Sequence, residues 1–224
     1  MATNSPKPVK PSFFNPKSAG TRFLTGLANL IIVNLLFIIT CIPVITIGDS
    51  ITSLYRITIA ILAGDNPSVW RDYLTCFKNN FLKATLFQLL YTALTAFFLF
   101  EIFMVNNMMD PQYYWAAYPA YFFLAVIFSS SIYTFPLLAW FDETFKQYLK
   151  NSVLIAVSNI PVTIMIIIIT DGIVFLTYQF TVTTLSILIF MGFSTIALFY
   201  SVFLKRIFEK FGAVISYDER EGRD

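Results

Sequence analysis

Four ionisable side chains interrupt apolar stretches of this chain: Asp49, Arg56, Glu101 and Asp171. Charged groups are costly in lipid, so such residues mark candidate functional sites. If the apolar stretches cross a membrane, the three acids lie at one depth, on a side without Lys or Arg. We therefore predict an outward-facing acidic vestibule of Asp49, Glu101 and Asp171 that binds a cation, a proton or sugar hydroxyls. The simpler alternative is that each acid reaches the membrane interface, with Asp49 capping a helix.

Arg56 is the one basic residue among these four. It lies about seven residues from the inner end of its apolar segment, which corresponds to about 10 Å along a helix. A lysine or arginine at that depth can extend its side chain to the lipid headgroups. We expect this arrangement for Arg56 in preference to pairing with a buried acid.

The bulk composition explains why these charges matter. Of the 224 residues, 57% are hydrophobic and only 12% are charged, whereas soluble domains contain about 25% charged residues. We therefore predict an all-helical integral membrane protein, with the lipid bilayer as its surroundings. Each apolar stretch approaches the roughly 20 residues that a membrane helix needs; the stretches are 24–42, 84–106, 113–139, 155–178 and 182–204, and residues 44–63 are a candidate sixth.

Charge placement decides whether residues 44–63 span the membrane. If they do, every Lys and Arg except Arg56 falls on one side of the membrane. Basic residues concentrate on the cytoplasmic side of membrane proteins. The sequence therefore predicts six spans with both termini in the cytoplasm. We divide the chain into a mobile tail (1–20), one transmembrane domain (21–206) and a charged tail (207–224).

The stretch "CIPVITIGDSITSLYR", residues 41–56, is then a tight external hairpin. Pro43 ends the first span, and Gly48 with Asp49 stands near the start of the second. On this topology Cys41 and Cys76 have the membrane between them, so we expect no disulfide and a packing role for both.

Two amphipathic segments connect spans on the cytoplasmic side. In residues 66–83, Asn66 can cap a helix that opens at Pro67. Residues 140–152 repeat the same character. We predict two interfacial elbow helices, which either anchor the protein in the interface or dock a membrane partner; the candidate docking side chains are Trp70, Tyr73, Phe77, Trp140, Phe145 and Tyr148.

Polar amides also occur within the apolar stretches, at Asn29, Asn34, Gln88 and Asn159. Such groups usually link membrane helices through hydrogen bonds. We predict this role for them; the alternative is a path for a polar substrate.

Signatures of enzymes are missing from the sequence. It has no His and only 8 Gly, and it contains no phosphate-binding glycine loop, metal-ligand cluster or nucleophile elbow. We therefore expect a protein without enzymatic activity or cofactor, and no binding of nucleic acid.

The N-terminal part resembles a known family. "FFNPKS", "RFLTGLANLIIVNLLFIITCIPVITIGDSITSLY" and "FKNNFLKATLF" follow one another in the order found in the YesL family of bacterial membrane proteins. The resemblance covers residues 12–90, and the matching positions are Phe14, Asn15, Pro16, Asn29, Asn34, Pro43, Val44, Thr46, Ile47 and Gly48.

The YesL family has no assigned function, but in Gram-positive bacteria it often accompanies genes for carbohydrate uptake and degradation. The resemblance implies a multi-pass protein of the bacterial cytoplasmic membrane, accessory to carbohydrate uptake or sensing. It also implies a sugar ABC transporter or a sensor kinase as partner. The alternative that the residues leave open is a small cation-coupled transporter or channel.

Overall fold

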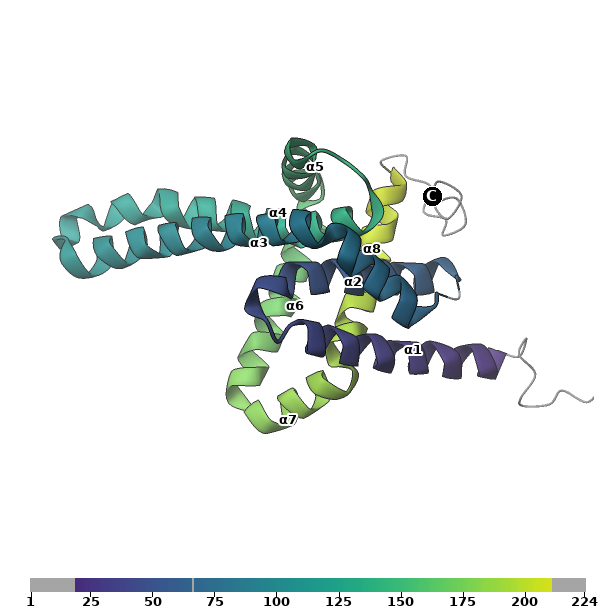
Figure 1. Ribbon diagram of the computed structural model, residues 1–224. Coiled ribbons are helices and arrows are strands. Elements are labelled where there is room, and N and C mark those ends of the chain that lie inside the picture. Colours follow the sequence, from purple (N-terminus) through teal and green to yellow (C-terminus); the bar gives the residue numbers. More distant parts are fainter. Residues whose placement is uncertain (1–18, 66, 211–224) are drawn as a thin grey trace, which may run out of the picture.

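The computed structural model describes residues 19–65 and 67–210 (Figure 1). Every regular element in these residues is a helix. Most of the predicted N-terminal tail, including Phe14, Asn15 and Pro16, lies outside the described residues, as does Asn66. The last helix continues to Lys210, and it buries Ile207 and Phe208 in the core. The helical domain therefore extends beyond the boundary predicted at residue 206.

The helices follow one another in a simple order. Three short segments of other helical type lie between them: the 3-10 turns Val44–Thr46 and Pro111–Ala117 and the π-helical segment Leu188–Gly192. The α-helices are α1 (Ala19–Thr40), α2 (Ile47–Ala63), α3 (Val69–Met108), α4 (Tyr118–Trp140), α5 (Phe145–Ser158), α6 (Ile160–Gln179), α7 (Thr181–Ile187) and α8 (Phe193–Lys210).

Five helical segments among the described residues are long and apolar enough to cross a membrane. They are Val44–Ala63, Val69–Met108, Gln112–Trp140, Ile160–Gln179 and Thr181–Lys210. The apolar part of α1, Leu24–Thr40, is shorter. The prediction of an all-helical membrane protein is thus confirmed, with five candidate spans; the sixth span and the orientation of the termini stay predictions.

The helical chain is interrupted between α1 and α2 at the position that the sequence predicts. α1 ends at Thr40, and α2 begins at Ile47, just after Pro43 and a 3-10 turn. The Thr46 hydroxyl donates to the carbonyl of Thr40 at 2.6 Å and to that of Pro43 at 2.7 Å. The first bond uses a carbonyl group that the end of α1 leaves without a helical partner, and the second adds to the bond that the Thr46 N–H donates to the Pro43 carbonyl at 3.0 Å.

The third helix differs from the prediction. α3 is continuous over 40 residues, so the separate elbow helix expected over residues 66–83 is wrong. No Gly or Pro occurs between Val69 and Met108 to interrupt it, and Pro67 precedes the helix. At 1.5 Å per residue α3 is about 60 Å long, about twice the thickness of the hydrocarbon core of a bilayer.

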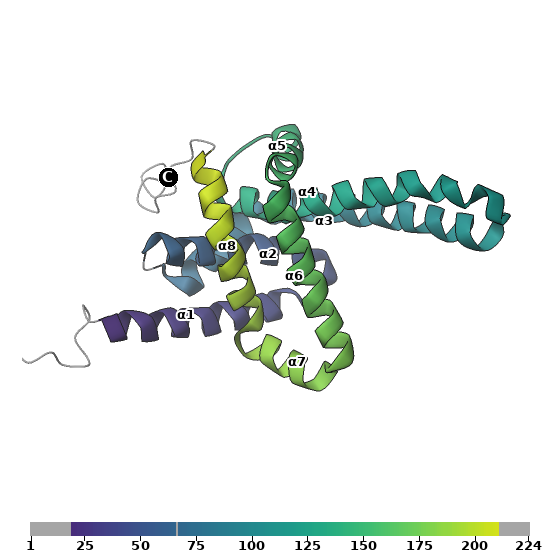
Figure 2. The same cartoon turned by 180° about the vertical axis from the view of Figure 1, so that it is seen from behind.

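The helices form two sets that cross one another (Figures 1 and 2). α1 to α4 run alongside each other, while α6 and α8 run across them and are joined at one end through α7. The far half of the α3–α4 hairpin projects from the body as an arm. Because the two sets cross, their axes cannot all be parallel to one bilayer normal.

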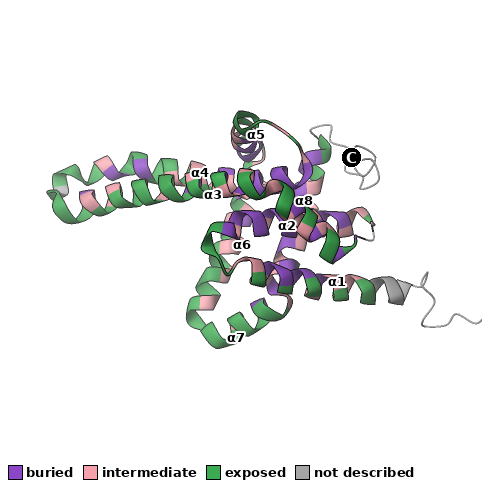
Figure 3. Cartoon of the chain, viewed as in Figure 1, coloured by how far each residue is buried: buried purple, intermediate pink, exposed green. Residues whose placement is uncertain are grey.

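α2 lies at the centre of the body. In its most apolar window 67% of the residues are buried, against 11% for α3, and Figure 3 shows this contrast between α2 and the exposed arm. A methyl group added at Gly48 would come within 2.7 Å of the Phe135 ring and 3.1 Å of the Ala84 carbonyl oxygen. Only glycine permits this approach of α3 and α4 to α2.

The second elbow is a separate helix, as predicted, but its limits differ. α5 runs from Phe145 to Ser158, and Trp140 is the last residue of α4. The chain then bends at Asn159, ahead of Pro161, and α6 begins at Ile160. The fifth span predicted from residue 155 therefore starts later, because a proline is favoured in the first turn of a helix and not in its interior.

Asn34 links α1 to the π-helical segment before α8. Its side-chain nitrogen donates to the carbonyl oxygens of Leu188 at 3.1 Å and Ile189 at 2.7 Å, and its side-chain oxygen accepts the Ser194 N–H at 3.0 Å. A π-helical turn displaces backbone groups from the regular helical pattern. Asn34 is fully buried, so it satisfies these groups where water is excluded. The linking role predicted for Asn34 is confirmed.

Substituting Asn34→Leu should destabilise the fold. The change keeps the size of the side chain but leaves two carbonyl groups and one N–H without their partner. We expect a loss of about 2–4 kcal/mol in the free energy of unfolding, measured by denaturation of the purified protein in detergent. Asn29→Leu is the matched control on the same helix, at a half-buried position. Equal effects of the two substitutions would contradict this role of Asn34.

Candidate functional site

The first turns of α2 carry a run of polar side chains that the fold buries completely. The run consists of Asp49, Ser50, Thr52 and Ser53. The Ser50 hydroxyl donates to the carbonyl of Thr46, and the Thr52 hydroxyl donates to that of Gly48, each at 2.9 Å. These two side chains are therefore satisfied within their own helix, a common solution for Ser and Thr in helices.

Asp49 has no such solution. It is fully buried, and neither carboxylate oxygen accepts a hydrogen bond from the described residues. The N-cap of α2 is Thr46, which makes no capping bond through its side chain. The alternative in which Asp49 caps a helix is therefore wrong. What remains is its position in the first turn of α2, where the helix dipole favours negative charge.

Ser53 lies one turn beyond Asp49 on the same face of α2. It is also fully buried, and its hydroxyl makes no hydrogen bond of regular geometry. It lies beside the Cys76 thiol. Asp49 and Ser53 together form a pair of buried polar groups: neither oxygen of Asp49 has a hydrogen-bonding partner among the described residues, and Ser53 has only the neighbouring Cys76 thiol.

Residues of α1 and α3 enclose this pair. The Tyr73 hydroxyl lies 2.7 Å from that of Thr40 and donates to the Ser50 carbonyl at 3.5 Å. The Cys41 thiol lies beside Ser50. Tyr73 thus joins the end of α1 to the polar run of α2.

The two cysteines lie closer to each other than predicted. Cys41 adjoins Ser50, and Cys76 adjoins Ser53, which is about one turn further along α2. The expectation of a membrane between them is therefore wrong, because Cys76 belongs to the part of α3 that packs along α2. Both thiols are free.

The vestibule of three acids is not formed as predicted. Gly48, the neighbour of Asp49, contacts α3 at Ala84 and Gln88. Glu101 follows Gln88 by thirteen residues on the same continuous helix, which is about 20 Å further along its axis. Asp171 is exposed on α6. The structure thus separates Asp49 from Glu101, and the candidate site reduces to Asp49 and its surroundings.

Arg56 is held inside the protein. Its guanidinium carbon lies 4.6 Å from the centroid of the Trp140 ring, and its Nη1 donates to the Ala139 carbonyl at 3.4 Å. A cation over the face of Trp is a favourable arrangement. The expected extension to the headgroups is replaced by contacts that fix the end of α4 against α2.

The candidate docking side chains of the elbows separate into two groups. Tyr73, Trp140 and Tyr148 are buried within the chain, and Phe77 packs against the α1–α2 core. These side chains do not offer a surface to a partner, because they form the contacts between helices. Trp70 and Phe145 are exposed, so the docking prediction stays open for these two.

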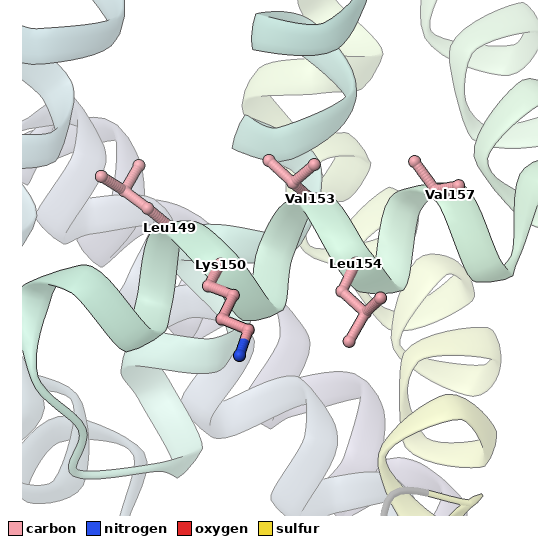
Figure 4. A pocket seen from close by; sticks show the side chains of 5 residues that line it. All are labelled: Leu149, Lys150, Val153, Leu154 and Val157. Atoms are coloured by element: carbon pink, nitrogen blue, oxygen red, sulfur yellow. The ribbon is translucent and has the colours of Figure 1, made fainter.

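α5 presents an apolar outer face that the sequence analysis missed. A shallow hollow runs along it, lined by Leu149, Lys150, Val153, Leu154 and Val157 (Figure 4). The signal was available in the four-residue spacing of Leu149, Val153 and Val157. The end of this pattern falls within the span predicted over residues 155–178.

A network of hydroxyl groups was also missed. The Tyr91 hydroxyl lies 2.9 Å from that of Ser130 and 2.7 Å from that of Thr134, and Ser130 lies 2.8 Å from Ser152. The network joins α3, α4 and α5 through buried side chains, as polar residues do in membrane proteins. Nothing in the sequence distinguishes these hydroxyls from the others in the apolar stretches.

Comparison with known proteins gives one similarity. Residues 30–102 match the model of a family described as "Protein of unknown function, DUF624". The matched segment contains the second half of α1, all of α2 and most of α3, and hence Asp49 and its neighbours. No curated protein and no solved structure matches the chain.

Substituting Tyr148→Phe should loosen the connection between α4 and α5. The Tyr148 hydroxyl accepts the Glu143 N–H at 3.0 Å and donates to the Phe141 carbonyl. Burial raises the pKa of the Tyr148 phenol, so it stays protonated and able to donate at neutral pH. We expect a loss of about 1–2 kcal/mol in the free energy of unfolding, measured by denaturation in detergent.

The control for this prediction is Tyr178→Phe, because Tyr178 is 82% exposed on α6. It should leave the free energy of unfolding unchanged. If Tyr148→Phe were as neutral as this control, the two bonds would not hold the connection.

Proposed function

We propose that this chain is a non-enzymatic accessory protein of the bacterial cytoplasmic membrane, which acts through contacts with other membrane proteins in carbohydrate uptake or sensing. The carbohydrate link and the partner class, a sugar ABC transporter or a sensor kinase, rest on the resemblance to the YesL family. The match to a family of unknown function covers part of the same region.

The observation that carries the proposal is the apolar outer face of α5. Leu154 and Val157 are exposed there, although α5 is not among the helices long enough to span. An exposed apolar face outside the lipid-spanning segments is typical of a surface that binds another protein or lies in the membrane interface, and we propose the first of these for α5. Lys146 and Lys150 flank this face with positive charge.

The topology that we propose places this face toward the cytoplasm. It has six spans, α1 included, with both termini inside, because that arrangement keeps the basic residues on the cytoplasmic side. It requires α6 and α8 to tilt strongly against α1 to α4, and α3 to extend beyond the hydrocarbon core. Membrane helices tilt by up to about 40°. Trp70 and Phe145, the exposed elbow aromatics, then add to the cytoplasmic docking surface.

A small cation-coupled transporter or channel is the second candidate. The observation that favours it is Asp49, an acid buried without a hydrogen-bonding partner among the described residues. Against it, the buried hydroxyls of Ser130, Thr134 and Ser152 are used in contacts between helices. If the purified protein alone carried out solute uptake in lipid vesicles, that result would favour a transporter or channel over the accessory function.

In-cell photo-crosslinking tests the accessory function. A photoreactive amino acid replaces Leu154 or Val157, and mass spectrometry identifies the adducts. We expect adducts with a sugar permease component or a sensor kinase, because the side chains at these positions point away from the body of the protein. The control is the same replacement at Tyr178, a more exposed position on α6, which should not capture that partner.

A second variant makes this result specific to the surface. Val157→Glu in a protein that carries the photoreactive residue at Leu154 should abolish the adduct, since a charge in the apolar face opposes docking. Adducts with lipid alone, or with other copies of this chain alone, would contradict the proposed function.

A further inference from the structure

The buried pair Asp49 and Ser53 calls for a ligand that the hydrogen bonds of the chain do not supply. Buried polar groups in folded proteins are almost always hydrogen-bonded, and each exception requires an explanation. An ionised carboxylate without a partner is among the most costly of these exceptions. Both carboxylate oxygens of Asp49 and the hydroxyl of Ser53 are such exceptions within the described residues.

The surroundings of the pair favour positive charge in the ligand. Asp49 lies near Tyr73 and Cys76 of α3. Of the other ionisable groups around the site, Cys41 lies near Tyr73 and Arg56 lies near Cys76. The Tyr and Cys side chains are neutral in their ordinary state at neutral pH. The guanidinium of Arg56 is engaged with the Trp140 ring and the Ala139 carbonyl. A carboxylate here therefore gains most from a small cation that enters the site.

The donor set restricts which cation this can be. The described residues contain no group of three or more His, Cys, Asp or Glu that could hold a metal ion. One carboxylate and one hydroxyl supply oxygen atoms only, which suit hard cations, and a single negative charge matches a single positive charge. Divalent ions, which usually take several carboxylates, are not matched by this set.

We propose that Asp49 and Ser53 form a binding site for one small monovalent cation, either a proton or a sodium ion. The site lies about one turn from the α1–α2 hairpin, whose residues Ile42 and Val44 are exposed. Occupation neutralises the carboxylate inside the packing of α1, α2 and α3. The inference concerns binding alone and stands whether or not the protein transports or docks a partner.

Labelling with dicyclohexylcarbodiimide tests this site. The reagent is apolar, and it reacts with a carboxyl group only while that group carries a proton. The full-length protein in detergent is treated over a range of pH, with sodium, potassium or choline chloride, and mass spectrometry measures the modification at Asp49. Asp49→Asn removes the label from this peptide with little change in size, and its elution as a single species shows that it folds.

Two results support the proposal and identify the cation. Labelling of Asp49 that falls as the pH rises, equally in all salts, identifies a proton site. Labelling that sodium suppresses, by about tenfold at a tenfold excess over its dissociation constant, and that potassium and choline leave unchanged, identifies a sodium site. In the second case Ser53→Ala should weaken the protection by sodium, and sodium should raise the Tm of the wild type but not that of Asp49→Asn.

Two results would overturn it. The first is labelling of Asp49 that depends on neither pH nor salt, which is the behaviour of a permanently neutral structural acid. The second is no labelling of Asp49 under any condition, together with no effect of sodium on Tm, while the exposed Asp171 is modified. Asp171→Asn is the matched control, and it should leave the labelling of Asp49 unchanged.

Discussion

The arrangement of the helices depends on burying α2, which carries five fully buried polar side chains, at the centre of an apolar protein. Polar groups that are removed from water must find partners inside the protein. α2 meets this demand in two ways: Ser50 and Thr52 bond to its own backbone, and Thr58 bonds to Ser201 of α8 at 2.9 Å. Gly48 leaves room for α3 and α4 to close over the helix. Small and hydroxyl-bearing residues are the usual means by which membrane helices pack closely.

The sequence was sufficient to predict the helical class, the break at Pro43 and the linking role of Asn34, because proline geometry and hydropathy act locally. It was not sufficient for α3. Charged residues at 71, 78 and 83 look like an interfacial elbow, but a chain without Gly or Pro has no reason to stop its helix there. The crossing of α6 and α8 over the other helices arises from packing between distant segments, such as Asn34 with Leu188 and Ile189, and it has no local signal.

The candidate site, like the fold, was only partly predictable from the sequence. The positions of Asp49 and Glu101 along the predicted spans indicate that the two acids lie at the same depth. In the structure Gly48 lies against Ala84 and Gln88, and this register of α2 on α3 separates the two acids. Register between helices is decided by close contacts, which hydropathy does not report. The same error placed Cys76 far from Cys41. Asp49 is buried in the structure without a hydrogen-bonding partner among the described residues, which neither the predicted vestibule nor the alternative of a helix cap describes.

A double-cysteine experiment tests the central position of α2 most directly. Thr58→Cys and Ser201→Cys are introduced together into a chain in which Cys41 and Cys76 are replaced by Ala, and the membranes are oxidised mildly. The hydroxyl oxygens of Thr58 and Ser201 lie 2.9 Å apart, so we expect an intramolecular disulfide between α2 and α8, and none when Thr195→Cys replaces Ser201→Cys. If the disulfide is absent from the Thr58→Cys/Ser201→Cys protein while both thiols stay reactive, α2 does not pack against α8 as described.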